Sequence, residues 1–597
     1  MRKQSSNFLP FILIPLLIAA VYYKIAGCEI LTNWDDQHFI TNNSLKESLS
    51  LNNIADVFSK QVMAHYHPLT ILLYSLIYNL FGTNAAAFHL VNLCLHAINS
   101  LLVYVLLCRC LKQNIAAVTG ACLFAVHPML VEAVAWLSAL STLLFTLFYL
   151  SGLIVYLKYT STNSMKFYFA TLAFFTLALF SKSMAVSFPF ILLLIDYVMK
   201  RDGIKRILTE KLPFLALSVL FGIIAVKSAM AFGSVNEESR VMYTFYDKFS
   251  LLFYSIDFYL VKFVVPFSLC AVHYLPDKPD GHLSILYYLS PLLLMVLIVS
   301  IVFIKKYRKM IFSGLLFFGI CILPALQLKQ IGFVIVAERY TYLPYFGLFL
   351  IAGLFAGIVA DRLSILKYGR TVFLIFIAMV LALNAVISSV RCTVWRDGIV
   401  LFSDVIEKYP EKALGYAYRG FAYHNKNMPD KAMSDYETAI SMGYRRPGLI
   451  HARAEIMYGF HPYSGIIHRF DHAIELNPDE GAGYYNRGNV KASDKFLDYR
   501  GSIQDFNKAE ELGYAPCYLY YNRGNSRRNT RDFEGAIEDY TRAIGMNNEM
   551  AQAYNNRGIA RLYMSDRRGA CEDWEIASGL GDKDARKSIV LYCQTDK

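Results

Sequence analysis

The sequence predicts an all-α protein in which a helical membrane domain of about eleven spans precedes an α-solenoid of short helical repeats. Of its 597 residues, 56% are hydrophobic and only 17% are charged, whereas soluble domains average about 45–50% and about 25%. Long apolar runs fill residues 1–390, and a motif of small residues recurs through residues 391–597. We therefore expect a multi-span domain over 1–390 and a repeat domain over 391–597.

The net charge of +12 belongs entirely to the predicted membrane domain, because residues 391–597 hold 29 basic and 29 acidic residues. Basic residues between apolar runs are typical of membrane topology, so the charge gives no reason to expect a nucleic-acid partner. The eleven cysteines form no CxxC pair and no metal-ligand spacing. Neither a disulfide framework nor a zinc site is expected from them.

Each membrane crossing needs about 20 mostly apolar residues in a helix. The first apolar run follows Arg2 and Lys3 and lacks a small-residue cleavage site, so we expect a retained span rather than a removed signal peptide. The spans are expected near residues 7–26, 89–108, 115–136, 139–158, 167–181, 184–198, 213–232, 284–304, 311–328, 341–360 and 371–390.

The basic residues also set the expected orientation of these spans. With the N-terminus in the cytoplasm, most basic residues of 1–390 fall in cytoplasmic segments. The first outer loop is then 27–88, the second is 233–283, and the repeats lie on the extracytoplasmic side. Within the second loop, the apolar stretch 249–275 must begin and end outside, as a re-entrant or interfacial hairpin broken at Pro266.

The repeats are defined by a glycine that follows an arginine in the segments YAYRG, YYNRG, YYNRG and YNNRG. These glycines lie 68, 36 and 34 residues apart, at Gly420, Gly488, Gly524 and Gly558. A period of 34 residues, with small side chains where two helices cross, is typical of tetratricopeptide repeats. We expect five repeats after a leading half-repeat at 395–410, stacked into a solenoid whose concave face binds a protein or peptide.

Asparagines near the repeat motif are candidates for that binding face. Amide side chains can bond to a peptide backbone without reading its sequence. Asn486, Asn522 and Asn555 lie close to the arginine of the motif, so we expect them in the groove. The alternative is that these side chains cap or bridge neighbouring helices.

The first outer loop begins with the run NWDDQHF, which places adjacent carboxylates at Asp35 and Asp36. One carboxylate raises the pKa of the other, so such a pair suits general-base chemistry. The alternative is an exposed loop turn. Further along, His89, Asn92 and His96 share one face of a helix. They form either a metal site or, as we favour in the absence of nearby carboxylate or cysteine ligands, a polar seam between helices.

Two basic residues are expected on the outer side, against the usual bias of membrane proteins. Lys182 lies in the run FSKSM, and Arg339 lies in AERYTYLPYFG. An anion such as a lipid phosphate would account for both positions. The alternative for Arg339 is a structural ion pair with its neighbour Glu338.

The order of these motifs resembles one family along nearly the whole chain. The motifs WDD, Y-x-PL, HLVN-x-x-LHA, FAVHP-x-x-x-EAVAW, SK and ER-x-x-YLP are followed by a repeat array that opens at W-R-D. Together they resemble the membrane proteins with C-terminal tetratricopeptide repeats that act as protein O-mannosyltransferases, and their bacterial relatives. The resemblance implies the polytopic GT-C glycosyltransferase fold. The DDQHF run is also similar to the acidic loop of the wider protein O-mannosyltransferases.

The resemblance implies an inverting glycosyltransferase that moves a sugar, such as mannose, from a polyprenyl-phosphate carrier to a hydroxyl of a protein acceptor. The repeats would recruit the acceptor, and neither a metal nor any cofactor is expected besides the lipid-linked donor. Relatives often carry Arg at the position of His67. A histidine binds a phosphate there only when its ring is protonated. By motif match, the base is Asp35 with Asp36 in support, the phosphate-binding residues are Arg339, Lys182 and His67, and the supporting residues are His38, His127, Glu132 and Glu338.

Two other functions remain open at this point. One is a non-catalytic, membrane-anchored tetratricopeptide scaffold for protein–protein interaction. The other is a transporter, against which the spans show no internal duplication. Convergence of Asp35, His127 and Arg339 would favour the enzyme. The chain has no retention signal and is short for the eukaryotic members, which favours a bacterial inner membrane over the endoplasmic reticulum.

Overall fold

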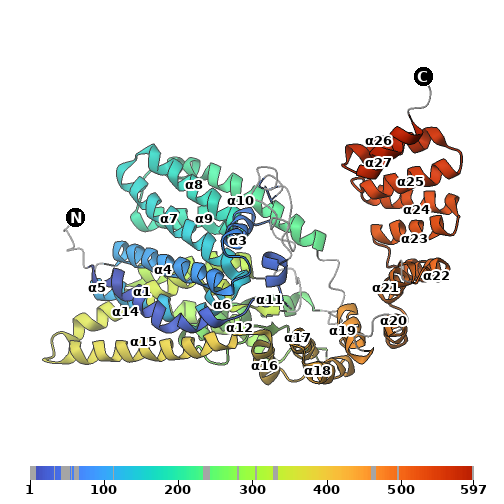
Figure 1. The fold of residues 1–597 in the computed structure, drawn as a ribbon. Helices are drawn as coiled ribbons and strands as arrows, with labels where there is room; N and C mark the ends of the chain where they lie inside the picture. The colour runs from blue at the N-terminus through green and yellow to red at the C-terminus, as the bar shows by residue number, and fades with distance from the viewer. Residues whose placement is uncertain are drawn as a thin grey trace. The chain divides into compact units, whose positions relative to one another are not determined.

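The computed structural model divides the chain into two compact units, Met1–Pro410 and Glu411–Lys597, and Figure 1 follows the helices of each. Residues 391–410, which the sequence analysis grouped with the repeats, fall within the first unit. The structure describes residues 8–32, 34–41, 54, 57–58, 66–111, 113–232, 243–278, 281–302, 305–326, 334–458, 465–493 and 496–593.

Helices make up nearly all of the first unit. They are α1 (Leu9–Tyr22), α3 (Pro68–Phe81), α4 (Ala85–Cys110), α5 (Asn114–Val126), α6 (Val131–Ala135), α7 (Leu140–Thr162), α8 (Met165–Ser181), α9 (Phe188–Met199), α10 (Ile204–Phe232), α11 (Phe245–Val264), α12 (Ile285–Val302), α13 (Arg308–Ile322), α14 (Tyr345–Leu363), α15 (Gly369–Val394) and α16 (Gly398–Lys408). Short helical turns join several of them, among them η2 (Gln37–Thr41), η4 (Pro128–Leu130), η5 (Leu137–Ala139), η6 (Ser183–Ser187) and η9 (Glu338–Thr341).

Among the described residues, seven helical segments are long and apolar enough to cross a membrane, and the bent pair α5–α6 would make an eighth. The seven are Leu9–Gly27, Ala85–Cys110, Leu137–Thr162, Ile204–Ser228, Arg308–Ala325, Tyr345–Leu363 and Gly369–Val394. The spans expected near 167–181, 184–198 and 284–304 correspond to shorter apolar helices, Met165–Ser181, Ser183–Met199 and Ile285–Ser300. A further short apolar helix, α3, lies within the segment that was expected as the first outer loop.

The span expected over 115–136 is bent by 53° between α5 and the helical turns that follow it. Pro128 has no N–H to bond to the preceding turn, and it disfavours a helical conformation at His127, whose ψ is 129°. The His127 ring caps the new turn, because its Nδ1 accepts a hydrogen bond from Met129 N–H at 3.3 Å. The bend places α6 against η9, and this contact builds the site described below.

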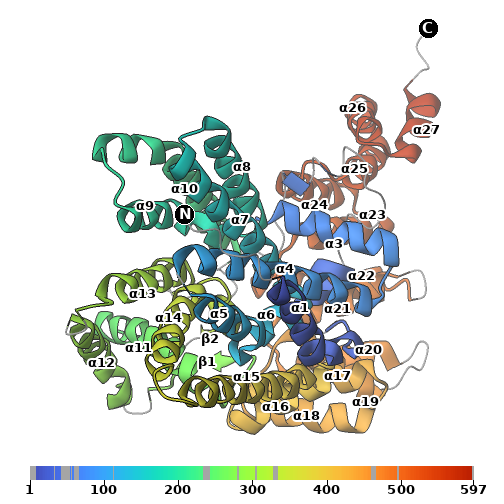
Figure 2. The same cartoon turned by 90° about the vertical axis from the view of Figure 1, so that its left-hand side faces the viewer.

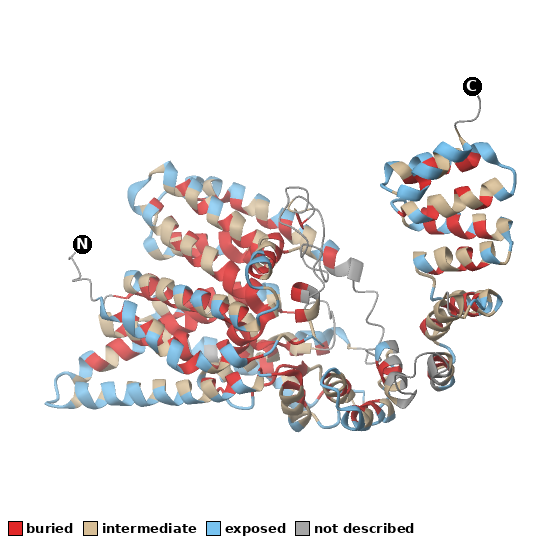
Figure 3. Ribbon diagram, in the orientation of Figure 1, coloured by how far each residue is buried: buried red, intermediate tan, exposed pale blue. Residues whose placement is uncertain are grey.

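Burial within the first unit is uneven. Phe124 on α5, Val131 on α6 and Phe145 on α7 are enclosed by neighbouring helices, whereas few residues of α15 are buried (Figure 3). The exposed side chains of α15 include large apolar ones such as Val372 and Phe376. A 26-residue helix with an apolar exposed surface suits contact with lipid.

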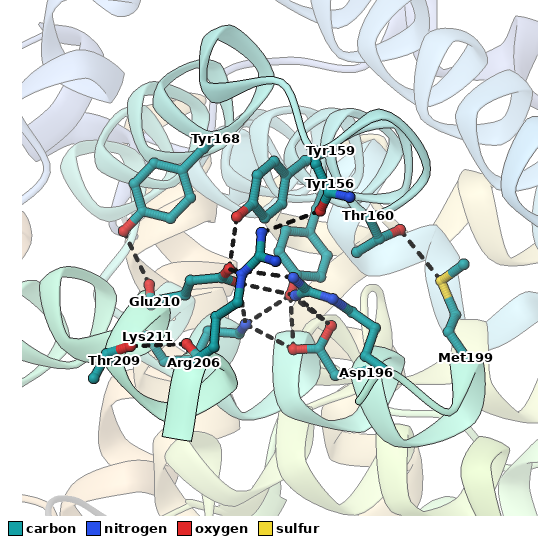
Figure 4. Close-up of polar contacts among 12 residues, drawn as sticks. Tyr156, Tyr159, Thr160, Tyr168, Asp196, Met199, Arg206, Thr209, Glu210 and Lys211 are labelled. Carbon is teal, nitrogen blue, oxygen red and sulfur yellow. Dashed lines mark hydrogen bonds and ion pairs between the residues drawn. The ribbon is translucent and has the colours of Figure 1, made fainter. Parts of the chain in front are cut away.

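A buried ionic network joins α7, α9 and α10 (Figure 4). Lys211 Nζ lies 2.6 Å from an Asp196 carboxylate oxygen and 2.6 Å from Tyr156 Oη, and all three side chains are buried. Arg201 adds hydrogen bonds of 3.2 Å to Asp196 and 2.9 Å to Glu210. Because each buried charge meets an opposite charge and further hydrogen bonds, the network can hold the three helices together without an uncompensated charge.

The apolar stretch 249–275 doubles back on itself. α11 ends at Val264, and the chain returns through strand β1 (His273–Tyr274) to Lys278, whose Nζ lies 2.8 Å from the carboxylate of Asp247 at the start of α11. The two ends of the segment therefore meet, which is the geometry of a hairpin. β1 pairs antiparallel with β2 (Val334–Val336), as seen in Figure 2, and β2 leads into η9.

The second unit is a row of paired helices, which confirms the predicted tetratricopeptide-like repeats. A Cβ at Gly420 would lie 2.6 Å from the Tyr436 ring of the paired helix, and one at Gly524 would lie 2.8 Å from Tyr540. The glycine of the motif is therefore needed for the close approach of the two helices. The helices are α17 (Ala413–Asn425), α18 (Pro429–Ser441), α19 (Pro447–Tyr458), α20 (Gly465–Leu476), α21 (Gly481–Ala492), α22 (Tyr499–Glu511), α23 (Cys517–Asn529), α24 (Phe533–Met546), α25 (Ala551–Tyr563), α26 (Arg567–Gly579) and α27 (Lys583–Tyr592).

The cysteine expectation is wrong at one place. Cys571 on α26 and Cys593, directly after α27, form a disulfide across Cα atoms 5.9 Å apart. Their spacing of 22 residues matches no metal or redox motif. With nine further cysteines in the chain, the sequence did not indicate which two would pair. The disulfide fixes the last helix of the array to the last helix pair.

Candidate active site

The acidic loop is anchored through Asp36. Its buried carboxylate accepts hydrogen bonds from Leu31 N–H at 3.1 Å and Ser138 N–H at 2.9 Å, and a further one from the Ser138 hydroxyl. Burial raises the pKa of Asp36 to about 6; the hydrogen bonds oppose this shift, and the Asp35 charge adds to it. Asp35 is only half-buried, so it is the more accessible carboxylate of the pair.

Arg339 in η9 is held by Glu132 of α6. Its Nη1 lies 2.5 Å from one Glu132 carboxylate oxygen, and its backbone N–H donates to the other at 2.9 Å. The guanidinium also lies 4.8 Å from the centre of the Trp136 ring and 5.0 Å from that of Tyr340. Burial alone would lower the pKa of Arg339, but Glu132, Tyr340 and Asp35 raise it above its usual range, so the guanidinium stays charged.

Lys182 joins this group from the turn between α8 and η6. Its Nζ donates to Thr142 Oγ1 at 2.6 Å and lies 5.9 Å from the centre of the Tyr340 ring. Burial, and then the charge of Arg339, lower the pKa of Lys182 to about 7, while Glu132 opposes the shift. This side chain can therefore gain or lose its proton near neutral pH.

One short segment, residues 131–139, connects the acidic loop with the basic residues. Ser138 bonds to Asp36, while Glu132 bonds to Arg339 and Trp136 packs on the same guanidinium. A carboxylate that can take a proton and cations that can stabilise a developing anion therefore belong to one cluster. The predicted site residues that come together in this way are Asp35, Asp36, Glu132, Lys182 and Arg339.

Glu338 does not pair with Arg339, which was the structural alternative for this dipeptide. Its fully buried carboxylate lies 3.5 Å from His273 Nε2 and 3.5 Å from an Arg391 nitrogen. Consecutive residues of a helical turn point in different directions, so Glu338 and Arg339 face different partners. The sequence could not show Arg391 as a partner, because it lies 53 residues further along the chain.

The predicted histidines lie in three different settings. Both ring nitrogens of His127 are bonded, since Nε2 lies 3.0 Å from Phe263 O and Nδ1 accepts from Met129, so this ring packs α5 against α11. His67 is buried directly before α3, and Thr70 on that helix donates to Ser181 O at 2.9 Å, beside Lys182. The His38 side chain lies outside the described residues.

The polar seam predicted on α4 is confirmed for Asn92 and His96 of its three residues. Asn92 donates to Val134 O at 3.0 Å, while the two ring nitrogens of His96 lie 2.7 Å from Tyr342 Oη and 3.0 Å from Ala125 O. These bonds join α4 to both sides of the α5–α6 bend and to the segment after η9. The seam therefore supports the backbone on which Glu132 and Arg339 are placed.

In the second unit, asparagine amides bridge successive repeats. Asn522 donates to Asn489 Oδ1 at 2.8 Å, and Asn556 donates to Asn525 Oδ1 at 2.9 Å. Asn556, rather than Asn555, directly precedes the arginine of its motif and so corresponds to Asn522. These contacts are of the bridging kind that the sequence analysis left open as the alternative.

The other two predicted groove residues differ from this pattern. Asn555 contributes its backbone carbonyl, which accepts a hydrogen bond from Trp574 Nε1 at 3.2 Å. Asn486 lines a small pocket together with Ile450 and Glu480.

The arginine of the repeat motif was missed as a structural residue. In four repeats its guanidinium bonds to an aspartate of the second helix at distances of 2.6 to 2.8 Å. A signal was present, because an aspartate follows each of these arginines after 16 or 18 residues. The pairs are Arg419–Asp435, Arg487–Asp505, Arg523–Asp539 and Arg557–Asp573.

Comparison with known proteins confirms the resemblance that the motif order indicated. The sequence model of the family described as dolichyl-phosphate-mannose-protein mannosyltransferase matches residues 66–229, and that of the tetratricopeptide repeat matches residues 518–550. The first match contains α3 to α9 and therefore Glu132 and Lys182; Asp35 and Arg339 lie outside it.

Curated relatives of the chain are named protein O-mannosyl-transferases. The chain is 25% identical over 428 residues to a protein O-mannosyl-transferase of Caenorhabditis elegans, covering 68% of this chain and 59% of that protein. It is 27% identical over 164 residues to protein O-mannosyl-transferase TMTC3 of Mus musculus, covering 26% of this chain and 18% of that protein. The chain thus spans less than two thirds of the length of either relative.

Solved structures similar to parts of the chain include tetratricopeptide proteins. The peptide-binding repeat protein YrrB is 18% identical and covers 32% of this chain and 97% of its own, with a TM-score of 0.27. The Pseudomonas aeruginosa protein pilF is 14% identical and covers 40% of this chain and 99% of its own, with a TM-score of 0.26.

Proposed function

We propose that this chain is a membrane glycosyltransferase that moves a sugar from a polyprenyl-phosphate carrier to a hydroxyl group of a protein acceptor. The observation that carries the proposal is the joint anchoring of the acidic loop and Arg339 by residues 131–139. The matches to mannosyltransferases support the transfer of a sugar, with mannose the first to test. The repeats of the second unit support recruitment of a protein acceptor.

The chemistry assigns a separate task to each charged group. Asp35 takes the proton of the acceptor hydroxyl as its oxygen attacks the anomeric carbon, while the bond from that carbon to the carrier phosphate oxygen breaks. The departing phosphate gains negative charge, which Arg339 and protonated Lys182 stabilise from fixed positions. Attack from the face opposite the phosphate inverts the configuration of the anomeric carbon. Asp36, bonded to Ser138, holds the loop in place.

The disulfide supports an extracytoplasmic position for the repeats. Structural disulfides form and persist in oxidising compartments and are rare in the cytosol, and Cys571–Cys593 belongs to the second unit. This agrees with the orientation that the basic residues favour. We propose a multi-pass protein of a bacterial inner membrane with its repeats on the periplasmic side.

The test is sugar transfer in vitro by the purified full-length protein, supplied with polyprenyl-phosphate mannose and other polyprenyl-phosphate sugars together with acceptor proteins from the same compartment. Transfer by the wild type and its loss in Asp35→Asn at matched expression and melting temperature are expected. Equal transfer by both proteins would remove Asp35 as the base. Acceptor binding without transfer from any donor would favour the alternative, a membrane-anchored scaffold. His67, where relatives often carry arginine, is the residue that supports this alternative.

A further inference from the structure

A buried ion-pair cluster is built on Glu338, the residue that precedes Arg339 in the turn η9. Glu338, the neighbour of Arg339, has no exposed surface, and its carboxylate lies 3.5 Å from Arg391 and 3.5 Å from His273. Within the described part of the chain, no hydrogen bond reaches either carboxylate oxygen. These two neighbours are therefore its ion-pair contacts, and of the two only Arg391 carries a permanent charge.

Arg391 itself is held in place from the other side. It lies near the end of α15 and is buried, and its Nη1 lies 3.0 Å from the carboxylate of Asp404 on α16. Lys408 extends the chain of contacts, with its Nζ 2.5 Å from Asp404 and 2.5 Å from Leu269 O. The guanidinium of Arg391 therefore joins the α15–α16 corner to the turn η9 that carries Arg339.

The same corner also supports the acidic loop. The Phe402 ring of α16 stacks on Trp34, next to Asp35, with ring centres 4.9 Å apart. Trp395, between α15 and α16, stacks on Trp136 at 5.9 Å. The acidic loop and the turn η9 are thus both supported by the α15–α16 corner. The charged contact between this corner and η9 is made by Arg391.

We propose that Arg391 is a positioning residue, which acts through Glu338 to hold Arg339 where the donor phosphate binds. Loss of Arg391 would leave His273 as the one ion-pair contact of the buried Glu338 carboxylate among the described residues, so η9 would shift until that charge is hydrated or neutralised. A displacement of about 1 Å at a binding group can lower activity by about 10²-fold. This inference rests on the proposed role of Arg339 in donor binding.

The experiment uses full-length protein in detergent and compares Arg391→Met, Arg391→Lys and Ser388→Ala. Ser388 is a matched control, because it is buried on α15 one turn earlier and donates to Val126 O at 2.7 Å. The first readout is hydrogen–deuterium exchange of peptides that cover residues 334–344, and it needs no substrate. Arg391→Met should raise exchange there, Arg391→Lys should raise it less, and Ser388→Ala should leave it unchanged. Unchanged exchange in Arg391→Met would overturn the inference.

The second readout is sugar transfer at varied donor concentration. Arg391→Met should raise the donor KM by about tenfold or more, within the loss expected from a misplaced binding group, and should change kcat less. Glu338→Gln combined with Arg391→Met should recover part of that loss, because the pair is then removed together. A loss that is equal in Ser388→Ala, or that is deeper in the double variant, would show a general packing effect and overturn the positioning role. A wild type inactive with every donor would refute the proposed function, and the exchange data would still decide whether Arg391 holds the turn.

Discussion

Glu132 and Arg339 are separated by 207 residues, yet one carboxylate binds both the guanidinium and the backbone N–H of Arg339. The contact fixes the side chain and the main chain of η9 at once. It depends on the bend at Pro128, which places α6 against η9. Removal of Arg339 would leave Glu132 as a buried carboxylate without its main counter-charge.

We expect Arg339→Ala to lower both stability and transfer. It leaves the fully buried carboxylate of Glu132 without its counter-charge, and breaking a buried pair typically costs about 3–5 kcal/mol. Glu132→Leu combined with Arg339→Met should recover most of the stability, because both charges are removed. Transfer should remain lost in both proteins, since neither has the guanidinium. Thermal unfolding and transfer assays measure the two effects separately, and recovery of activity in the double variant would contradict the role of Arg339.

Asp35→Asn should abolish transfer with little change in melting temperature. Loss of a general base typically costs about 10²–10⁴-fold in rate, and Asp35 is only half-buried. Asp36→Asn is the matched comparison. Because Asp36 accepts hydrogen bonds from Leu31 and Ser138, its replacement should loosen the loop and lower the melting temperature. The roles would have to be exchanged if Asp36→Asn lost more activity than Asp35→Asn at equal stability.

Local sequence patterns predicted the helices and their pairing, but they did not predict contacts between residues that are far apart in the sequence. Apolar runs predicted the long helices, and the spacing of glycines predicted the paired helices that Gly420 and Tyr436 bring together. Asp35 was predicted as one of two adjacent carboxylates in an outer loop, and Arg339 as a basic residue on the outer side of the membrane. In contrast, the partners of Glu338 depend on how β1, η9 and α15 pack, which no sequence spacing encodes. The bend at Pro128 could have been predicted from the effect of proline on a helix, but the continuous apolar run 115–136 was interpreted as one straight span.

The ionic network of α7, α9 and α10 should be a main source of stability in the first unit. Asp196→Asn leaves Lys211 buried without a full counter-charge, and we expect a loss of about 3–5 kcal/mol. Arg206→Ala is the matched control, because this exposed residue bonds to Glu210 of the same network and exposed ion pairs contribute little to stability. Thermal unfolding in detergent measures both. Equal losses in the two variants would show that burial does not determine the strength of these pairs.

Cys571 and Cys593 should be isolated as one disulfide-linked peptide pair when the protein is alkylated before lysis and digested without reductant. The expectation follows from their contact in the structure and from an oxidising location of the repeats. Cys571→Ser should lower the stability of the second unit by roughly 3 kcal/mol, the value typical of a closed loop of this length, and Cys517→Ser, at a free cysteine, should not. Alkylated free thiols at both positions in the wild type would argue for a cytosolic location.

Donor binding should weaken as the pH rises through about 7, because Lys182 has its pKa lowered to about 7 by burial and by Arg339. Below this pH the ammonium is charged and attracts the donor phosphate; above it the neutral amine no longer does. The loss of one charged hydrogen bond, worth roughly 1.5 kcal/mol, corresponds to about tenfold in affinity. Bound phosphate favours the protonated lysine and so moves the transition to higher pH.

Lys182→Arg stays charged throughout and should bind the donor equally at about pH 6 and about pH 8, roughly one unit on either side of the transition. Lys182→Met should bind the donor weakly and without that pH dependence. Titration of polyprenyl-phosphate mannose, a phosphodiester without a second ionisation near pH 6, against the three proteins decides between these outcomes: the same slope in wild type and Lys182→Arg would assign the pH dependence to another group.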